Sequence, residues 1–406
     1  METLDILLLA FEFPPYPLAG TGLYALNLVK SLKKHNVTVL TPNHSGKDSS
    51  EQIENATIKR ISLSSFTLIN KFSGQAKVNR SFIDKKTLFS LKAKRYIREQ
   101  VALGEYDLFH SLNERDGAFL DYAMMNKNLP TIVSVNDYYI LGSSLNPLAF
   151  EFKSTDLPLR YVHHNIMKQV YKKELRACTR IIPNCNFVSK IIQKACAVSQ
   201  EKITVIHRGI DTKKFDILPE KNKYTSKKVL FIGPNAERKG ALFLVQAVPA
   251  ILKEHPESHF TLIGSCSAIY RRKLFSFIEK HNLSSSMTYI EHLPQDQLLK
   301  YYREANIFVM PSIMEAMGQV YLEAMSSRTP VIGADVGGVG EIITPDVGYL
   351  VPPRSPEVIA ETINLLLSDP LLAERLGKRG NERALGYFSI ERQMKETMDV
   401  YKSLLR

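Results

Sequence analysis

The chain has 406 residues, of which 44% are hydrophobic, 23% are charged and 9% are aromatic. This composition excludes a wholly disordered protein, and the length exceeds what one ordinary hydrophobic core accommodates, so we expect two domains. The 53 Lys and Arg residues outnumber the 41 Asp and Glu residues, which gives a net charge of +12. Such a balance favours a polyanionic neighbour, which can be nucleic acid, an anionic membrane face or a phosphate-bearing ligand.

Targeting and cross-linking features are few. No stretch approaches 18 consecutive apolar residues, so we expect no membrane-spanning helix. The apolar run from Ile6 to Phe11 follows an acidic start, unlike a secretory signal, and we interpret it as the first buried strand of a cytoplasmic protein. A location at the inner face of the cell membrane stays open. The four cysteines lack C-x2-C spacing and a neighbouring His cluster, so neither a zinc site nor a disulfide framework is predicted.

Short runs rich in Ile, Val and Leu alternate with longer amphipathic segments in two successive series. This alternation is typical of an α/β protein in which helices cover both faces of parallel sheets. We expect strands at 4–10, 38–41, 108–111, 131–135, 180–182 and 204–207, then at 228–232, 259–263, 287–290, 307–310, 330–334 and 348–351. We expect helices at 23–35, 241–255, 270–282, 296–305, 320–327, 356–368 and 390–406.

The segment between the two series, 211–227, is polar and lacks periodicity, so we interpret it as a linker. The prediction is two doubly wound, Rossmann-like domains at 1–210 and 228–387, followed by a closing helical segment at 388–406. Ligands of open α/β sheets bind at the carboxyl ends of the strands, which places the expected site in the cleft between the domains.

The strongest local pattern spans 311–325. An apolar strand ends in Pro-Ser, a loop carries Glu315 and Gly318, and a helix begins near Gln319. The free N–H groups of Gln319 and Val320, together with the helix dipole, predict an anion site suited to a diphosphate. Gly318 allows a ligand to approach the backbone closely.

Two glutamates flank this predicted anion site. Glu323 lies about one turn into the helix, where its carboxylate can accept hydrogen bonds from a vicinal diol such as ribose. Glu315 would reach towards a sugar bound at the other end. The alternative is structural: Glu323 on a solvated face and Glu315 as a helix cap.

Other segments add candidate phosphate contacts. Gly20-Thr21-Gly22 follows a strand and precedes a helix, which predicts a second anion site or a plain turn. Arg238 and Lys239 can supply cations to a leaving diphosphate, or form a solvated basic turn.

A longer basic region runs from Lys71 to Arg98, where nine basic residues face one acid, Asp84. Its interleaved apolar residues suit an anionic membrane surface, and an ordinary solvated helix face remains the alternative. No recognition motif accompanies the charge, so we do not expect nucleic-acid binding.

These motifs, in their order and spacing, resemble the retaining family-4 glycosyltransferases of the GT-B fold. Glu315-x7-Glu323, the stretch from Thr329 to Gly338 and Glu341 carry the resemblance in the second half. Further matches are Phe13-Pro14-Pro15 with Gly20–Tyr24, Tyr106–His110, Arg208–Asp211, Phe231-Ile232-Gly233 with Arg238–Gly240, and Phe388–Glu391 with Tyr401. The resemblance implies that the closing helix crosses back to the first domain and that His110, Asn136 and Asp137 lie at the donor sugar.

Two positions depart from the family pattern. Val135-Asn136-Asp137 stands where "VHD" is usual, and Asn cannot shuttle a proton near neutral pH. Pro234 stands where many relatives have Arg, so the diphosphate would rest on Arg238 and Lys239. The resemblance also implies that basic side chains and helix dipoles replace a metal, and we expect no metal and no cofactor.

The hypothesis is a retaining, metal-independent glycosyltransferase that moves a sugar from a nucleotide-diphosphate sugar to a glycan or lipid-linked acceptor, as in polysaccharide biosynthesis. Its catalytic residues would be Glu315, Arg238 and Lys239. The alternative is a non-catalytic GT-B subunit that binds nucleotide, a partner or a membrane. An NAD-dependent dehydrogenase is set aside because the first strand lacks a full G-x-G-x-x-G followed by an acidic residue.

Overall fold

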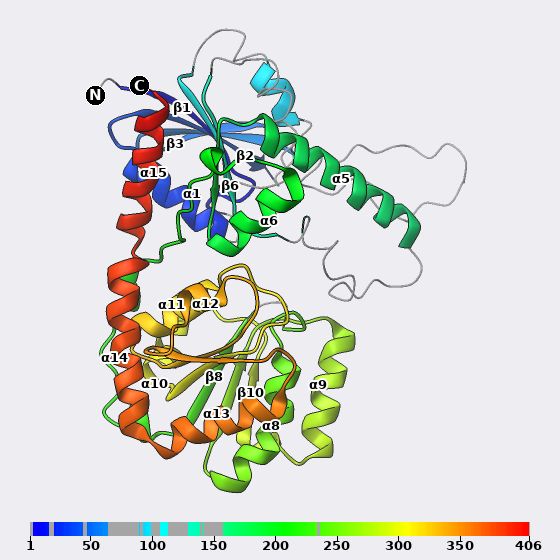
Figure 1. Ribbon diagram of the computed structural model, residues 1–406, viewed down its shortest axis with the longest axis vertical. Helices are drawn as coiled ribbons and strands as arrows, with labels where there is room; N and C mark the ends of the chain where they lie inside the picture. The colour runs from blue at the N-terminus through cyan, green and yellow to red at the C-terminus, as the bar shows by residue number, and fades with distance from the viewer. Residues whose placement is uncertain are drawn as a thin grey trace.

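The computed structural model describes residues 3–15, 20–43, 47–63, 89, 92–98, 106–112, 129–138, 141, 157–233 and 236–405. Of the basic region at 71–98, only 89 and 92–98 fall within these ranges, and Pro234 falls outside them. Two sheets lie one above the other in Figure 1. Each sheet and the helices that cover it form one domain, and we call the two the N-terminal and C-terminal domains.

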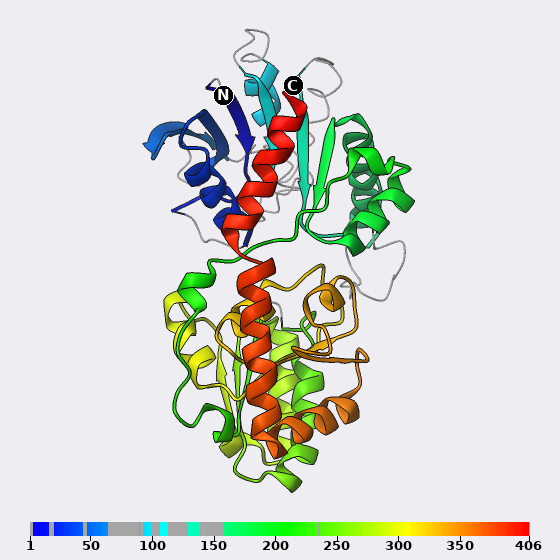
Figure 2. The same cartoon turned by 60° about the vertical axis from the view of Figure 1, so that its left-hand side comes forward.

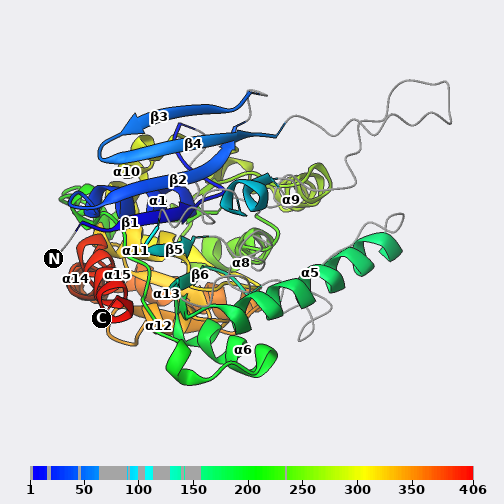
Figure 3. The same ribbon diagram turned by 90° about the horizontal axis from the view of Figure 1, so that it is seen from above.

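The N-terminal domain is built on a seven-stranded sheet of order β3-β4-β2-β1-β5-β6-β7, in which only β3 pairs antiparallel. Its central strands are buried on both faces, as parallel strands covered by helices require. Viewed from above, β3 and β4 form one edge of the sheet and α5 and α6 lie towards the other (Figure 3). The elements are β1 Asp5–Leu9, α1 Gly20–Ser31, β2 Asn36–Asn43, β3 Ser49–Ile53, β4 Ala56–Ser62, β5 Leu108–Ser111, β6 Thr131–Val135, α5 Leu157–Ala177, β7 Arg180–Pro183 and α6 Asn186–Cys196.

The C-terminal domain has a six-stranded, all-parallel sheet of order β10-β9-β8-β11-β12-β13. Its strands are β8 Lys228–Ile232, β9 His259–Ile263, β10 Met287–Ile290, β11 Ile307–Met310, β12 Val331–Ala334 and β13 Gly348–Val351. Its helices are α8 Ala241–Glu254, α9 Ala268–Lys280, α10 Gln295–Glu304, α11 Gln319–Ser326, α12 Val339–Ile342, α13 Pro356–Ser368 and α14 Pro370–Tyr387. The doubly wound α/β prediction is confirmed for both halves.

One predicted strand is wrong. At 204–207 the N–H groups of Thr204 and Ile206 donate to the carbonyls of Ile181 and Pro183, which starts a ladder beside β7. Pro183 has no N–H to return a bond, so the pairing ends after an isolated bridge. The prediction also missed β3, β4, α5, α6 and α14.

The predicted linker is partly structured and lies against the C-terminal domain. It contains α7 (Thr212–Phe215) and the 3-10 turn η3 (Lys223–Thr225). The buried ammonium of Lys223 donates to the carbonyls of Tyr302 and Ser327 and to the hydroxyl of Thr329, over 2.7–2.9 Å. These bonds fix the segment on the C-terminal domain.

The chain passes between the domains twice, and the two passages lie side by side. From α14 it continues into α15 (Ile390–Leu404), which lies on the N-terminal domain (Figure 2). The N–H of Ile210 donates to Phe388, and the N–H of Ile390 donates back to Ile210. A Cβ on Gly209 would lie 2.4 Å from the carbonyl oxygen of Ser389, so the backbones are in direct contact. The two passages therefore form one paired crossing between the domains.

Among the described residues, no helix is both long and apolar enough to cross a bilayer. In the same ranges, no three His, Cys, Asp or Glu side chains gather as a metal site would require.

Candidate active site

Two loops at the carboxyl ends of neighbouring strands, β8 and β11, form one unit. The carbonyl of Arg238 accepts a hydrogen bond from the N–H of Ile313 over 2.9 Å, and its guanidinium donates to the carbonyl of Met314 over 2.8 Å. Gly240 has φ +78°, and a Cβ there would lie 1.9 Å from the carbonyl oxygen of Pro311. Only glycine permits this contact, which seats the 238–240 turn against the loop that carries Glu315.

Glu315 is 6% exposed and forms an ion pair with the ammonium of Lys239, while a guanidinium nitrogen of Arg238 lies 3.6 Å from the same carboxylate oxygen. Burial disfavours the charged carboxylate, but the charges of Lys239 and Arg238 outweigh it and hold the pKa of Glu315 below its ordinary value. The sequence prediction that these three side chains share one site is consistent with this geometry. An ionised Glu315 can accept hydrogen bonds from sugar hydroxyls.

α11 begins at Gln319, directly after Gly318, as the sequence predicted. Gly318 has φ +83°, and a Cβ there would lie 2.7 Å from the ring of Tyr321. No side chain in the described part of the chain caps this N-terminus. The first-turn N–H groups at Gln319 and Val320 therefore suit an anionic group, and the cations of Lys239 and Arg238 offset the charge of the nearby Glu315.

Glu323 lies farther along α11 and interacts with α10. The hydroxyl of Tyr302 donates to its Oε2 over 2.8 Å. Burial raises the pKa of Glu323 to about 7, while the Tyr302 hydrogen bond and the charge of Lys214 oppose the rise. Tyr302 was not identified from the sequence, where it is one apolar residue of an amphipathic helix.

The loop that carries Glu315 is inserted into the N-terminal domain. The neighbouring side chains Met314 and Ala316 belong to the apolar cluster that also contains Tyr138 and Cys185 of that domain. The thiol of Cys185 donates to the carbonyl of Ala316 over 3.2 Å. Tyr138, which the sequence analysis also missed, has a hydroxyl that contacts the backbone of Glu315.

The remaining predicted N-terminal residues are placed differently. Gly20, Thr21 and Gly22 form the first turn of α1, and Figure 1 shows α1 and α6 on the side that faces α11 and α12. The side-chain amide of Asn136 donates to the carbonyl of Leu112 over 3.0 Å, joining the ends of β5 and β6, and Asp137 follows it.

His110 lies apart from this group. It is fully buried, and its ring nitrogens lie 2.6 Å from the hydroxyl of Tyr401 on α15 and 2.8 Å from the hydroxyl of Ser134. Burial lowers its pKa to about 3, so the ring is neutral. This placement favours docking of α15 as the role of His110 over contact with a substrate.

Solved structures share this architecture over the whole chain. Sucrose-phosphate synthase from Thermosynechococcus elongatus matches with a TM-score of 0.77 and 20% identity, covering 99% of both chains. The Anabaena protein HepE in complex with UDP and glucose matches with a TM-score of 0.71 and 15% identity, covering 98% of this chain and 100% of that one. The protein is therefore of the GT-B class, with two Rossmann-like domains.

Sequence comparison identifies the family. Residues 18–214 match the model of Glycosyltransferase Family 4, and residues 213–383 match that of Glycosyl transferases group 1. The chain belongs to the family-4 glycosyltransferases of the GT-B fold.

Two curated relatives show how far the sequence similarity extends. An uncharacterized glycosyltransferase of Methanocaldococcus jannaschii is 31% identical over 231 residues, which are 53% of this chain and 58% of the relative. Glycogen synthase of Mycobacterium tuberculosis is 27% identical over 206 residues, 50% of this chain and 49% of that one. The chain thus spans 58% and 49% of the length of these two relatives.

Proposed function

We propose that this protein transfers a sugar from a nucleotide-diphosphate sugar to an acceptor hydroxyl. The observation that carries the proposal is the cluster of Lys239, Arg238 and Glu315 beside the uncapped N-terminus of α11. Cations and oriented N–H groups stabilise the charge that develops on a departing diphosphate. They are effective because they are already oriented before the reaction begins.

In the proposed reaction, the bond between the anomeric carbon and the diphosphate oxygen breaks, and a bond from the acceptor oxygen to the same carbon forms. The acceptor proton passes to the departing phosphate on the same face of the sugar, so the anomeric configuration is retained without a covalent intermediate. Lys239, Arg238 and the first turn of α11 bind the leaving diphosphate in place of a metal. Glu315 holds the sugar hydroxyls, and Glu323 holds the ribose.

The titles of structural neighbours support a nucleoside diphosphate as the leaving group. HepE is described in complex with UDP, and starch synthase IV of Arabidopsis thaliana is described bound to ADP and acarbose. We extend the proposal to a glycan or lipid-linked acceptor at the N-terminal domain. The net charge of +12 supports an anionic membrane face as the location of such an acceptor.

Calorimetric titration with UDP, GDP and ADP tests the donor site. We expect micromolar binding of one nucleotide, lost in Glu323→Ala and kept in Glu357→Ala, an exposed first-turn glutamate of α13 in the same domain. Binding of none would remove the donor-site assignment.

A second function is favoured by Asn136, whose side-chain amide donates to the carbonyl of Leu112 and which replaces the histidine of the "VHD" pattern that the family resemblance implies. This is a non-catalytic subunit that binds nucleotide, a partner or a membrane. The test incubates the protein with UDP-, GDP- and ADP-sugars, with and without glycan acceptors. Nucleotide binding without release of free nucleoside diphosphate would favour the non-catalytic subunit over the transferase.

A further inference from the structure

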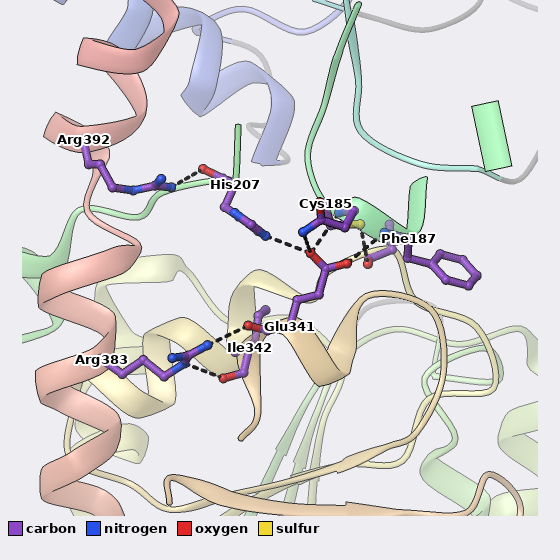
Figure 4. A network of polar contacts seen from close by, with 9 residues as sticks. Cys185, Phe187, His207, Glu341, Ile342, Arg383 and Arg392 are labelled. Atoms are coloured by element: carbon purple, nitrogen blue, oxygen red, sulfur yellow. Dashed lines mark hydrogen bonds and ion pairs between the residues drawn. The ribbon is translucent and has the colours of Figure 1, made fainter. Parts of the chain in front are cut away.

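The side-chain carboxylate of Glu341, in the C-terminal domain, forms hydrogen bonds with the N-terminal domain. Glu341, on α12, accepts from the N–H of Phe187 and from both the N–H and the side-chain amide of Asn186, each over 2.8 Å (Figure 4). The Nε2 atom of His207 lies 2.8 Å from the same carboxylate. The side chain of Glu341 is 21% exposed, so these bonds are partly shielded from solvent.

The recipient is the N-terminus of α6. Its N-cap residue, Cys185, supplies no side-chain hydrogen bond, and the first N–H groups of a helix have no partner within the helix. Glu341 therefore caps this helix from the other domain and places a negative charge at the positive end of its dipole. Although burial opposes ionisation, these hydrogen bonds lower the pKa of Glu341 to about 2, so the cap is charged at neutral pH.

The same contact is joined to the loop that carries Glu315. The N–H of Gly338 donates to the carbonyl of Ala316 over 2.9 Å, and a Cβ on Gly338 would lie 2.2 Å from that oxygen. A Cβ on Gly337, at φ +59°, would lie 1.7 Å from the carbonyl oxygen of Glu315. On the other side, the ring of Phe187 packs edge-on against Tyr138, with centroids 5.1 Å apart. Glu341, α6 and the Glu315 loop thus form one packed group.

The group also reaches the two C-terminal helices. Arg383 of α14 donates to the carbonyls of Glu341 and Ile342, over 2.9 and 3.0 Å, and Arg392 of α15 donates to the carbonyl of His207 over 2.9 Å. Figure 4 shows these residues as one network between the domains. Movement of the domains about the paired crossing would have to break the bonds of Glu341.

We propose that Glu341, through Asn186, Phe187 and His207, is an interdomain latch that holds the domains closed and so positions the Glu315 loop for sugar transfer. Glu341 is a positioning residue, since it acts through α6 and the 314–316 loop and not on the reacting atoms. The effect on transfer rests on the proposed function, whereas the closure itself does not.

The first test measures closure without activity. Hydrogen exchange reports the amides of Asn186 and Phe187, and spin labels at Lys190 and Glu361, both exposed, report the interdomain distance. In Glu341→Ala we expect faster exchange at these two amides and a longer, broader distance distribution. Glu357→Ala should match the wild type in both. Unchanged exchange and distance in Glu341→Ala would overturn the proposal.

The second test separates positioning from stability. We expect Glu341→Ala to keep the nucleotide Kd, because Glu323 and α11 are untouched, and to lower kcat by about tenfold to a hundredfold. If this variant unfolds, Glu341→Gln keeps the size and one acceptor oxygen while removing the charge, and should show the same pattern at smaller amplitude. An unchanged kcat in an opened, folded variant would overturn the positioning role. Failure of the wild type to bind nucleotide would remove the proposed function and leave the closure test intact.

Discussion

The hydroxyl of Tyr302 donates a hydrogen bond to Oε2 of Glu323 over 2.8 Å, which joins α10 to α11 at the expected ribose position. Tyr302 is fully buried, and its own carbonyl accepts from the ammonium of Lys223 and the hydroxyl of Thr329. One residue thus connects the proposed nucleotide contact to the segment that leads in from the N-terminal domain.

Nucleotide binding should depend on the ionisation of Glu323. Its pKa of about 7 means that the carboxylate loses its proton between pH 6 and 8, and only the ionised form accepts from both ribose hydroxyls. We expect affinity to rise with pH across this window, by at most about tenfold per pH unit below the pKa. Calorimetry in two buffers of different ionisation enthalpy should detect a proton released on binding.

The terminal phosphate of the nucleotide also titrates near pH 6. Glu323→Gln therefore serves as the reference, and the difference between its profile and the wild-type profile isolates the carboxylate. Tyr302→Phe removes a bond that lowers the pKa of Glu323, so the midpoint should move to higher pH. If nucleotide affinity depended on pH in the same way for the wild type and Glu323→Gln, Glu323 would not be the residue that binds the ribose.

Lys223→Ala should destabilise the protein. The buried Ser327 carbonyl and Thr329 hydroxyl would lose this donor, and the Tyr302 carbonyl would keep only the Thr329 hydroxyl, which costs about 1–3 kcal/mol. Burial lowers the pKa of Lys223 to about 7, below its unfolded value, so the unfolded chain binds the proton more tightly. The contribution of this group to stability therefore grows as pH rises from 7 towards 10.5. Urea unfolding at pH 7 and 9 measures both effects, with the exposed Lys221→Ala as the control.

Gly318→Ala should strain the site. At φ +83° an alanine is disfavoured by about 1–3 kcal/mol, and its Cβ would contact the ring of Tyr321. We expect lower stability and weaker nucleotide binding, measured by thermal unfolding and calorimetry. Gly386→Ala, on α14 with no atom within 4 Å of its added Cβ, should leave both unchanged or slightly raise stability. Equal behaviour of the two variants would show that the left-handed conformation at 318 is not required.

Tyr401→Phe should affect the fold and not the ligand. It leaves Nδ1 of the buried His110 without its partner on α15, which costs about 1–3 kcal/mol. We expect a lower Tm, an unchanged nucleotide Kd and faster hydrogen exchange along α15. A weakened nucleotide affinity at unchanged Tm would instead indicate that His110 contacts the substrate.

Most of the architecture was predictable because parallel strands covered on both faces appear as continuous apolar runs. The run at Ile307–Met310 is an example, fully buried in the sheet. The edge strand Ser49–Ile53 has almost no apolar residue and is exposed, so composition could not indicate it. In α14, Gly377 disrupts the helical pattern because it packs against the carbonyl of Arg328, where a Cβ would lie 2.3 Å from the oxygen.

The candidate site divides in the same way. Glu315, Lys239 and Gly318 were predictable, since loops after neighbouring parallel strands meet at one edge of a sheet. Tyr302, Tyr138 and the partners of Glu341 were not, because their roles arise from contacts between segments distant in the chain. Periodicity describes what each segment buries and does not say which side chain it meets.

The docking of α15 on the first domain has a consequence for the order in which the protein is made. The ribosome synthesises β1 to β7 long before residues 390–404, yet Met394, Val400 and Tyr401 complete the apolar cluster over β1, β2 and α1. Until those residues emerge, the nascent N-terminal domain exposes that surface, and the ring of His110 lacks its hydrogen bond with the Tyr401 hydroxyl. The first half to be translated is therefore the last to be finished, and chaperones that bind apolar surface have their longest opportunity there.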